Sequence, residues 1–395
     1  MTATTATARA RPALPAILWP RLFGNFVIGT GVMIVPGTLN EISGSLQIPV
    51  ATAGTLISAS ALLMCLGAPL CAALVAGWDR RRLLALSMLW YGLLHLACTL
   101  APSFAALLPL RVIAMIAPAI FTPQAAACVG MLVPPELRGR AITFVFLGWS
   151  VASVLGMPIG AYVGGTLGWQ AAFALVGVFS LTSAVWVWRA MPDGIRPPAL
   201  SMAAWRETLR SRPLMLCVAV TVLYSAGQFV LFSYFAPYYK ARLAITPGEL
   251  SLLFMWFGAF GFIGNLVMSR HIDRVGADTA VMIGIALMAV SLLAWPLGTH
   301  VLLAALVSVP WALGCFSSNS AQQARLVGIA PALAAGSIAL NSSAMYAGQA
   351  IGATGGGWLI DHDGMGLLHW AGFGGLLLAM GVSAVATRSR HARTA

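Results

Sequence analysis

A single arginine, Arg111, stands inside a long apolar stretch of this 395-residue chain. A guanidinium group within a membrane-spanning helix costs several kcal/mol unless it faces water or a polar partner. At about 100° of rotation per residue, Met115, Pro118 and Thr122 share a helix face with Arg111. We expect this face to line a cavity in which Arg111 binds an anionic or polar substrate or takes part in proton coupling. The alternative is a structural arginine bonded to neighbouring carbonyl groups.

Carboxylates are missing from the centres of the apolar stretches. All ten Asp and Glu residues fall in predicted loops or at the ends of apolar runs. Because membrane proteins that move protons commonly titrate a buried carboxylate, proton coupling here would have to use Glu41 or His95. We expect His95 to be a packed, neutral imidazole and Glu41 to be a solvated helix end. A positive cavity without carboxylates favours an anionic or neutral substrate over a cation.

Sequence signatures of enzymes, nucleotide sites and metal sites are missing. The chain has no Gly-x-x-x-x-Gly-Lys-Ser/Thr motif, so ATP is not expected to be its direct energy source. It also lacks His-Glu-x-x-His, Cys-x-x-Cys and Gly-x-Ser-x-Gly, and its six cysteines lie unpaired in apolar runs. We expect no enzyme activity, no cofactor and no metal.

The elements that carry these residues are membrane-spanning helices. Hydrophobic residues make up 59% of the chain and charged residues only 8%, against about 25% charged residues in soluble proteins. This composition excludes a soluble enzyme, a disordered protein and a nucleic-acid-binding domain. The apolar runs do not alternate with polar residues as the strands of a membrane β-barrel do, so the predicted fold class is all-α.

Twelve apolar runs are each long enough to cross a bilayer, which takes about 20 residues. They predict two six-helix lobes, residues 1–190 and 214–395, joined by a loop over 191–213 that is rich in proline and arginine. The predicted spans are 16–39, 50–76, 83–101, 106–133, 141–165, 169–190, 214–239, 248–269, 279–298, 300–323, 335–360 and 366–387.

The basic residues are divided unequally between the two sides of this arrangement. Nineteen of the 22 Lys and Arg residues fall on one side, Lys240 and Arg242 fall on the other, and Arg111 lies within a span. Because cytoplasmic loops carry the excess of basic residues, we expect a multi-pass protein of the bacterial inner membrane with both termini in the cytoplasm. The net charge of +12 then reports topology in a lipid bilayer, and no nucleic-acid partner is expected.

The two halves repeat an Asp-Arg pair in the loop after their second span. The pairs are Asp79 with Arg80 and Asp273 with Arg274. An internal repeat of this kind is typical of two-lobed transporters.

Glycine and proline recur in the fifth predicted span, at Gly156, Pro158 and Gly160. Small residues at this spacing let helix backbones approach closely, so we expect a helix-packing hinge there, with tight packing alone as the alternative.

In these features the chain resembles the major facilitator superfamily, in its twelve-helix drug and sugar exporter branch. The resemblance runs from about residue 20 to 385 and includes Gly67-Ala68-Pro69, Leu110-Arg111-Val112 and Gly156-Met157-Pro158-Ile159-Gly160. It is nearest to the arabinose-, purine- and chloramphenicol-type exporters. Two positions depart from that pattern: Arg82 replaces a loop glycine, and Pro118-Ala119 replaces a His-Gly pair.

The resemblance implies roles for several of these residues. The Asp-Arg pairs, Asp79 with Arg80 and Asp273 with Arg274, would act as a gating latch, and Arg111 would face the central cavity. The glycines and the proline of the fifth span would be associated with antiport.

In that family the first, fourth, seventh and tenth helices surround the substrate. The first, seventh and tenth predicted spans carry polar or aromatic residues at helical spacing: Asn25, Tyr224, Gln228, Trp311 and Asn319. We expect them to line the cavity with Arg111, Met115 and Thr122, although packing between helices is the alternative for each.

The sequence therefore predicts a secondary transporter that exports a small organic molecule in exchange for protons by alternating access, and we expect a monomer. An uncoupled facilitator or an importer of a neutral or anionic molecule is one alternative. A membrane sensor or scaffold that has lost transport is another. Loss of the proton gradient distinguishes the proton-coupled exporter from the uncoupled facilitator, since a facilitator still equilibrates its substrate.

Overall fold

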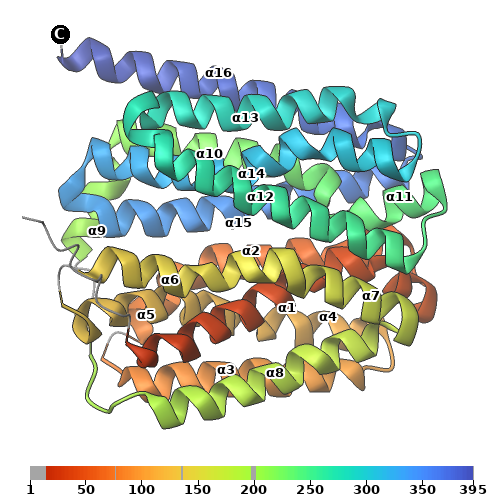
Figure 1. Ribbon diagram of the computed structural model, residues 1–395, viewed down its shortest axis with the longest axis horizontal. Helices are drawn as coiled ribbons and strands as arrows, with labels where there is room; N and C mark the ends of the chain where they lie inside the picture. Colours follow the sequence, from red (N-terminus) through yellow and green to blue (C-terminus); the bar gives the residue numbers. More distant parts are fainter. Residues whose placement is uncertain (1–14, 76, 135–136, 197–201, 395) are drawn as a thin grey trace, which may run out of the picture.

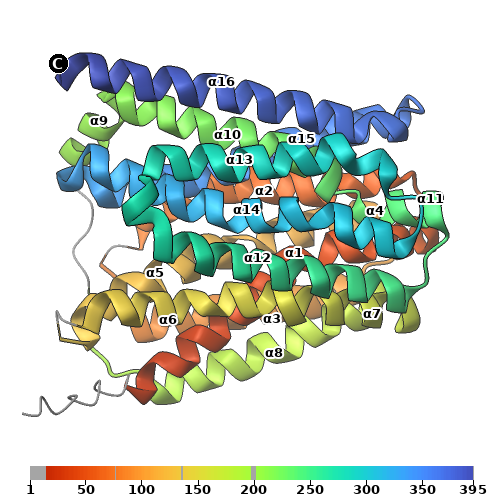
Figure 2. The same cartoon turned by 45° about the horizontal axis from the view of Figure 1, so that its top comes forward.

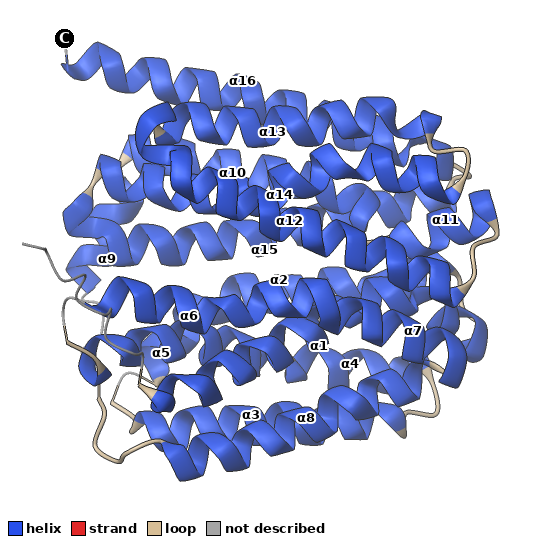
Figure 3. Ribbon diagram, in the orientation of Figure 1, coloured by secondary structure: helices blue, strands red, loops and turns tan. Residues whose placement is uncertain are grey.

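The computed structural model of the protein describes residues 15–75, 77–134, 137–196 and 202–394, and these residues form helices and connecting turns without a strand (Figure 3). The helices of the first half are α1 (Trp19–Leu46), α2 (Val50–Leu74), α3 (Arg80–Thr99), α4 (Phe104–Ala114), α5 (Ile116–Leu132), α6 (Arg138–Val151), α7 (Met157–Leu167) and α8 (Trp169–Ala190). Those that follow are α9 (Met202–Arg210), α10 (Arg212–Phe232), α11 (Phe235–Leu243), α12 (Pro247–Val275), α13 (Ala277–Ala294), α14 (Val301–Ile329), α15 (Ala334–Asp361) and α16 (Leu368–Thr394).

Eleven helical segments of the described residues are long and apolar enough to cross a membrane, and each matches one of the predicted spans. The twelfth predicted span, 335–360, corresponds to α15, a helix of 28 residues. Its glycines and its polar residues, such as Asn341 and Gln349, lower its mean hydropathy. A membrane-spanning helix tolerates such residues where they face other helices rather than lipid. The structure thus confirms the all-α membrane fold.

The helices form an elongated bundle in two groups (Figure 1). Helices α1–α8 lie in one half and α10–α16 in the other, with α8 and α16 at opposite edges in both views (Figure 1, Figure 2). The halves meet where α2 packs against α15 and where α7 packs against α12. We call the two ends of the bundle the α9 end and the α11 end. The exact lobe boundaries at residues 190 and 214 stay a prediction.

The fourth predicted span is divided at Met115 into α4 and α5. Pro118 has no N–H to donate, and its ring would collide with the carbonyl of Ala114 in a continuous helix. The N–H of Met115 instead donates to the carbonyl of Val112 over 3.0 Å, in a tighter turn. Arg111 therefore lies in the last turn of α4, where the helix macrodipole favours a positive charge. The sequence prediction missed this break.

The fifth predicted span contains a π-helical turn, Ala152–Gly156, directly before Pro158. A wider turn accommodates the missing proline N–H. The backbone of α12 crosses this turn so closely that a Cβ atom at Gly258 would lie 2.2 Å from the carbonyl oxygen of Ser153. On the other side, added Cβ atoms at Gly156 and Gly160 would collide with α1. These contacts explain the glycines by packing, and the hinge role of Gly156, Pro158 and Gly160 stays a prediction.

We expect Gly258→Ala to destabilise the protein by about 1–3 kcal/mol, the usual range for overpacking. The added methyl group meets the backbone of Ser153 and Val154, which cannot rotate away as a side chain could. Gly44→Ala is the matched control, because nothing lies within 4 Å of a Cβ atom at Gly44. Thermal unfolding in detergent measures both, and equal melting temperatures for the two variants would contradict this account of the crossing.

Candidate functional site

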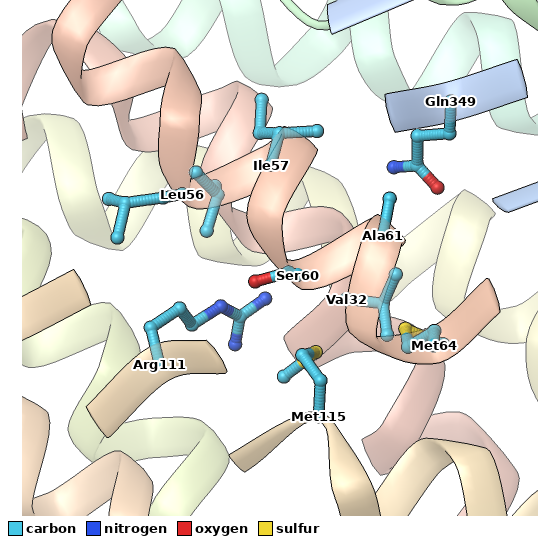
Figure 4. Close-up of a pocket in the computed structure, with 10 residues that line it drawn as sticks. Val32, Leu56, Ile57, Ser60, Ala61, Met64, Arg111, Met115 and Gln349 are labelled. Atoms are coloured by element: carbon cyan, nitrogen blue, oxygen red, sulfur yellow. The ribbon is translucent and has the colours of Figure 1, made fainter. Parts of the chain in front are cut away.

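A small internal pocket lies where α1, α2 and α4 of the first half meet α15 of the second (Figure 4). Its volume of about 10 Å³ is room for about one water molecule. The polar groups on its wall come from Ser60, Arg111 and Gln349, and Figure 4 shows the guanidinium of Arg111 directed toward Ser60. The remaining wall is apolar and consists of Val32, Val35, Leu56, Ile57, Ala61, Met64 and Met115.

Arg111 is held by two hydrogen bonds and is only 1% exposed. Its Nη1 lies 2.8 Å from Nε2 of His95 on α3. Its Nη2 donates to the carbonyl oxygen of Gly31 on α1 over 2.6 Å. The ring of Phe173 lies 5.6 Å from its Cζ atom, within the range of a cation–π contact. We call this arrangement the docked position of Arg111.

The contacts of His95 determine its tautomer. Nδ1 lies 2.8 Å from the carbonyl oxygen of Tyr91, and a carbonyl only accepts, so Nδ1 carries the proton. Nε2 therefore offers its lone pair to the N–H of Arg111, because the guanidinium only donates. His95 is fully buried, and both of its nitrogens are used by these bonds. The geometry agrees with the packed, neutral imidazole predicted from the sequence.

Three polar groups at the pocket lack partners among the described residues. Nε of Arg111 and Oγ of Ser60 are buried without a hydrogen bond, and Gln349 is 8% exposed with no side-chain hydrogen bond among the described residues. Buried polar groups are normally bonded, and the pocket between these three has room for about one water molecule. The Nε–H of Arg111, the amide N–H groups of Gln349 and the hydroxyl of Ser60 can each donate to an acceptor, such as a water, carbonyl, nitro or carboxylate oxygen.

Comparison with known proteins settles the family. The sequence model described as Major Facilitator Superfamily matches residues 21–242, which is more than half of the chain. The chain belongs to the major facilitator superfamily. It is therefore a membrane transporter in its family and fold, and not an enzyme.

Individual relatives support the same assignment. A chloramphenicol resistance protein from Streptomyces lividans is 33% identical over 273 residues, which are 68% of this chain and 69% of that protein. A probable sugar efflux transporter from Mannheimia succiniciproducens is 25% identical and covers 89% of this chain and 88% of its own. The fold is also similar to that of a D-xylose–proton symporter, with a TM-score of 0.72 at 17% identity over 93% of this chain and 96% of that one.

Of the eight cavity residues predicted for this superfamily member, the structure brings Arg111 and Met115 to the pocket. Thr122 does not share their position, since the break at Met115 separates it from the pocket. Its hydroxyl donates to Oδ1 of Asn25 over 2.8 Å, and Nδ2 of Asn25 donates to the carbonyl of Val145 over 3.1 Å. These bonds join α1, α5 and α6.

The other four predicted residues form hydrogen bonds between helices of the second half. Tyr224 donates to Sδ of Met345 over 3.2 Å. Nε1 of Trp311 lies 3.4 Å from Oε1 of Gln228. Oδ1 of Asn319 accepts from Asn341 over 3.0 Å. They do not line the small pocket, and their contact with substrate stays a prediction. The sequence analysis missed Ser60 and Gln349, which carry no signal beyond being polar in apolar runs.

Asp79 caps the first turn of α3. Its carboxylate accepts from the backbone N–H groups of Arg81 at 3.0 Å, Arg82 at 3.2 Å and Gly194 at 2.6 Å. Partial burial alone would raise the pKa of Asp79, but the N–H donors of Arg82, Gly194 and Arg81 outweigh it, so the pKa lies below its ordinary value. These bonds connect α3 to the beginning of the central loop.

We expect Asp79→Ala to destabilise the protein by about 1 kcal/mol through loss of the cap, while Asp79→Asn, which can still cap, loses less. Because the pKa of Asp79 is lower in the folded protein, its stabilisation is present above the ordinary value of about 3.9 and is lost as the pH falls through the folded value. Thermal unfolding near neutral pH and in acid measures this, and an Asp79→Ala protein as stable as the wild type at both would refute it.

The remaining latch residues differ in their surroundings. Arg80 is buried and donates to the carbonyls of Val75 and Trp78 at 2.9 and 2.8 Å. Asp273 and Arg274 are exposed at the α9 end of α12. Val75 and Trp78, which accept hydrogen bonds from Arg80, lie in the first half of the bundle. The latch role of all four residues stays a prediction.

A buried ion pair that the sequence analysis missed lies at the α9 end of the second half. Nε of Arg325 on α14 lies 2.5 Å from Oδ1 of Asp278 on α13. The other guanidinium nitrogens donate to Oγ of Ser383 at 3.1 Å and to Oγ1 of Thr387 at 2.9 Å, both on α16. One arginine therefore joins three helices. The sequence placed both charges in loops, because nothing in their spacing pairs residues on different helices.

Proposed function

We propose that the protein is a secondary active exporter that moves a small organic molecule across the bacterial inner membrane in exchange for protons. The observation that carries the proposal is the pocket, in which the buried Arg111 and Ser60 of the first half line one space with Gln349 of the second half. Relative motion of α15 against α2 would open and close this site, as alternating access requires.

The orientation of the proposed exporter follows from its charges. The arginines of α9, of the first turn of α3 and of the last turns of α12 and α14 lie at the α9 end, so this end is proposed to face the cytoplasm with both termini. The two halves are in contact toward the α11 end, where Ser251 of α12 donates to the carbonyl of Pro158 over 2.9 Å. A Cβ atom at Gly165 would collide with Pro247 there.

The proposed substrate is neutral or anionic and carries a hydrogen-bond acceptor. Arg111 has no carboxylate partner among the described residues, so a cation would meet an uncompensated positive charge. Relatives named for chloramphenicol resistance and sugar efflux supply the first compounds to test. Chloramphenicol is neutral and carries nitro and carbonyl oxygens, which fit N–H donors.

Cellular accumulation of a labelled panel tests the proposal. The panel contains chloramphenicol, neutral sugars and small carboxylates, and each is measured with and without a protonophore. We expect the protein to lower the accumulation of at least one compound, and the protonophore to restore it. Depletion that is insensitive to the protonophore would favour the uncoupled facilitator, and no depletion across the panel would favour a protein that does not transport.

We also propose that Asp79 with Arg80, and Asp273 with Arg274, bias the bundle toward one of its two access states. Asp79→Asn should then change the labelling of single cysteines placed at the α9 end without abolishing substrate binding. Wild-type labelling and transport in this variant would contradict the latch.

A further inference from the structure

We propose that His95 carries the exchanged proton, and that this proton and the side chain of Arg111 compete for the same lone pair on Nε2. The inference rests on the proposed function, because it assigns the residue through which exchange with protons would occur. It follows from the bonds that hold His95 and Arg111 and from the direction in which Arg111 points.

Only one atom of His95 can take up a proton. Nδ1 already carries hydrogen, which it donates to the carbonyl oxygen of Tyr91 over 2.8 Å. Nε2 has a lone pair, and in the docked position Nη1 of Arg111 occupies it at 2.8 Å. A proton on Nε2 would point directly at another donor. Protonation of His95 therefore requires Arg111 to leave the docked position.

The surroundings of His95 strengthen this exclusion. The titratable or charged groups near it are Tyr91 and Cys98 on α3 and Arg111 on α4, with Cys98 close enough to Arg111 to interact with it. Helix α1 contributes the carbonyl of Gly31. Helix α8 contributes the ring of Phe173, 5.7 Å from the imidazole, and Tyr346 of α15 interacts with Tyr91. None of these groups is a carboxylate, so an imidazolium and a docked guanidinium would repel each other without compensation.

The docked position of Arg111 is also the position that completes the pocket. With Nη1 and Nη2 bonded to His95 and Gly31, Arg111 lines the pocket together with Ser60 and Gln349, and its Nε is buried without a hydrogen bond. A substrate acceptor bound to Arg111 in this position would stabilise the docked position. A proton on His95 would displace Arg111 from the docked position. Substrate and proton therefore exclude each other, which is the condition for antiport.

The proton balance of the cycle is simple. With the site open to the outside, substrate leaves, Arg111 moves away, and Nε2 of His95 takes a proton from external water to form the imidazolium. With the site open to the cytoplasm, Nε2 returns the proton to water, and Arg111 docks again. One proton enters for each molecule exported, and no other donor or acceptor is needed.

Other buried titratable groups of the spans fit this role less well. Glu41, predicted to be a solvated helix end, is instead partly buried toward the α11 end of α1, with its Oε2 shielded from solvent. His369 lies near the start of α16. Neither lines the pocket or bonds to Arg111.

Histidine NMR tests the competition without any substrate. The full chain is labelled with ¹⁵N-histidine and placed in lipid bilayers, and the His95 signal is assigned by its loss in His95→Gln. We expect the neutral Nδ1–H form in the wild type from about pH 8 to pH 6. In Arg111→Met, a clearly larger fraction of His95 should be protonated at about pH 6. A wild-type Nε2–H tautomer, or a His95 that stays neutral in Arg111→Met down to about pH 5, would overturn the proposal.

Transport by His95→Gln supplies a second test that does not depend on the Arg111 variant. The amide oxygen of glutamine can accept from Arg111 near the position of Nε2, but it does not take up a proton in the physiological range. With labelled chloramphenicol in proteoliposomes, we expect chloramphenicol–chloramphenicol exchange to remain and accumulation driven by a pH gradient to fall about 10-fold or more. His271→Gln, an exposed residue of α12, should leave both unchanged.

Gradient-driven accumulation within about twofold of wild type in His95→Gln would overturn the assignment of the proton to His95. If the wild type does not transport chloramphenicol at all, chloramphenicol is excluded as the substrate of the proposed exporter. The NMR measurement still decides whether the proton and Arg111 compete for Nε2.

Discussion

Replacement of Arg111 by alanine is expected to lower the initial rate of gradient-driven transport by about 100-fold or more. The variant removes the donor that faces the pocket and leaves Nε2 of His95 and the carbonyl of Gly31 without their partner. A hydrogen bond from a charged group to the substrate is worth about 1.5–3 kcal/mol, and the upper end of this range corresponds to about this factor. The measurement is uptake of the labelled panel compound into proteoliposomes at equal protein density.

Two further variants control this prediction. Arg111→Lys keeps the charge but not the planar fork that reaches two acceptors, so its rate should lie between those of alanine and the wild type. Arg242→Ala changes an exposed arginine at the α11 end and should leave transport unchanged. If Arg111→Ala folds and transports within about twofold of the wild type, Arg111 is a structural arginine and the pocket is not the site.

Loss of the carboxylate in Asp278→Ala is expected to destabilise the protein by about 3 kcal/mol, because Arg325 would remain buried without its counter-charge. Arg325 is 1% exposed and holds α13, α14 and α16 together. The side chain of Asp278 is 19% exposed, so water offsets part of the loss, and the value lies at the low end of the range for buried pairs. Thermal and denaturant unfolding in detergent measure the change.

A double variant distinguishes the ion pair from the space that Asp278 fills. Asp278→Ala combined with Arg325→Met removes both charges, and replacing a buried pair by apolar groups is often nearly neutral. The double variant should therefore recover much of the stability that the single variant loses. A double variant less stable than Asp278→Ala would contradict the account.

The sequence was sufficient for the spans and for recognising Arg111 as a charge buried within one of them, because both follow from local composition. Apolar runs of sufficient length predict helices wherever they occur, and eleven of them recur as candidate spans. An arginine inside such a run is unusual enough to be noticed. The break at Met115 was less visible, since Pro118 in a span can kink, interrupt or be accommodated by a helix.

The pocket partners could not be obtained in the same way. Ser60 and Gln349 come from α2 and α15, which are adjacent only in the folded bundle. The sequence did not identify His95 as the partner of Arg111 for the same reason. His95 lies on a neighbouring helix, and its role depends on a contact in the folded protein rather than on a spacing in the sequence. Thr122 shows the reverse case, since an ideal helix placed it beside Arg111 and the break directs it to Asn25 instead.

The most direct test of the account is gradient-driven transport by the purified full chain in proteoliposomes. An inside-acid pH gradient is imposed, and accumulation of labelled chloramphenicol, a neutral sugar and a small carboxylate is followed with and without nigericin. We predict uphill accumulation of at least one compound by the wild type, its loss with nigericin, and its absence in Arg111→Ala. Equal final levels with and without the gradient, or no movement of any compound, would contradict proton-coupled export through the Arg111 pocket.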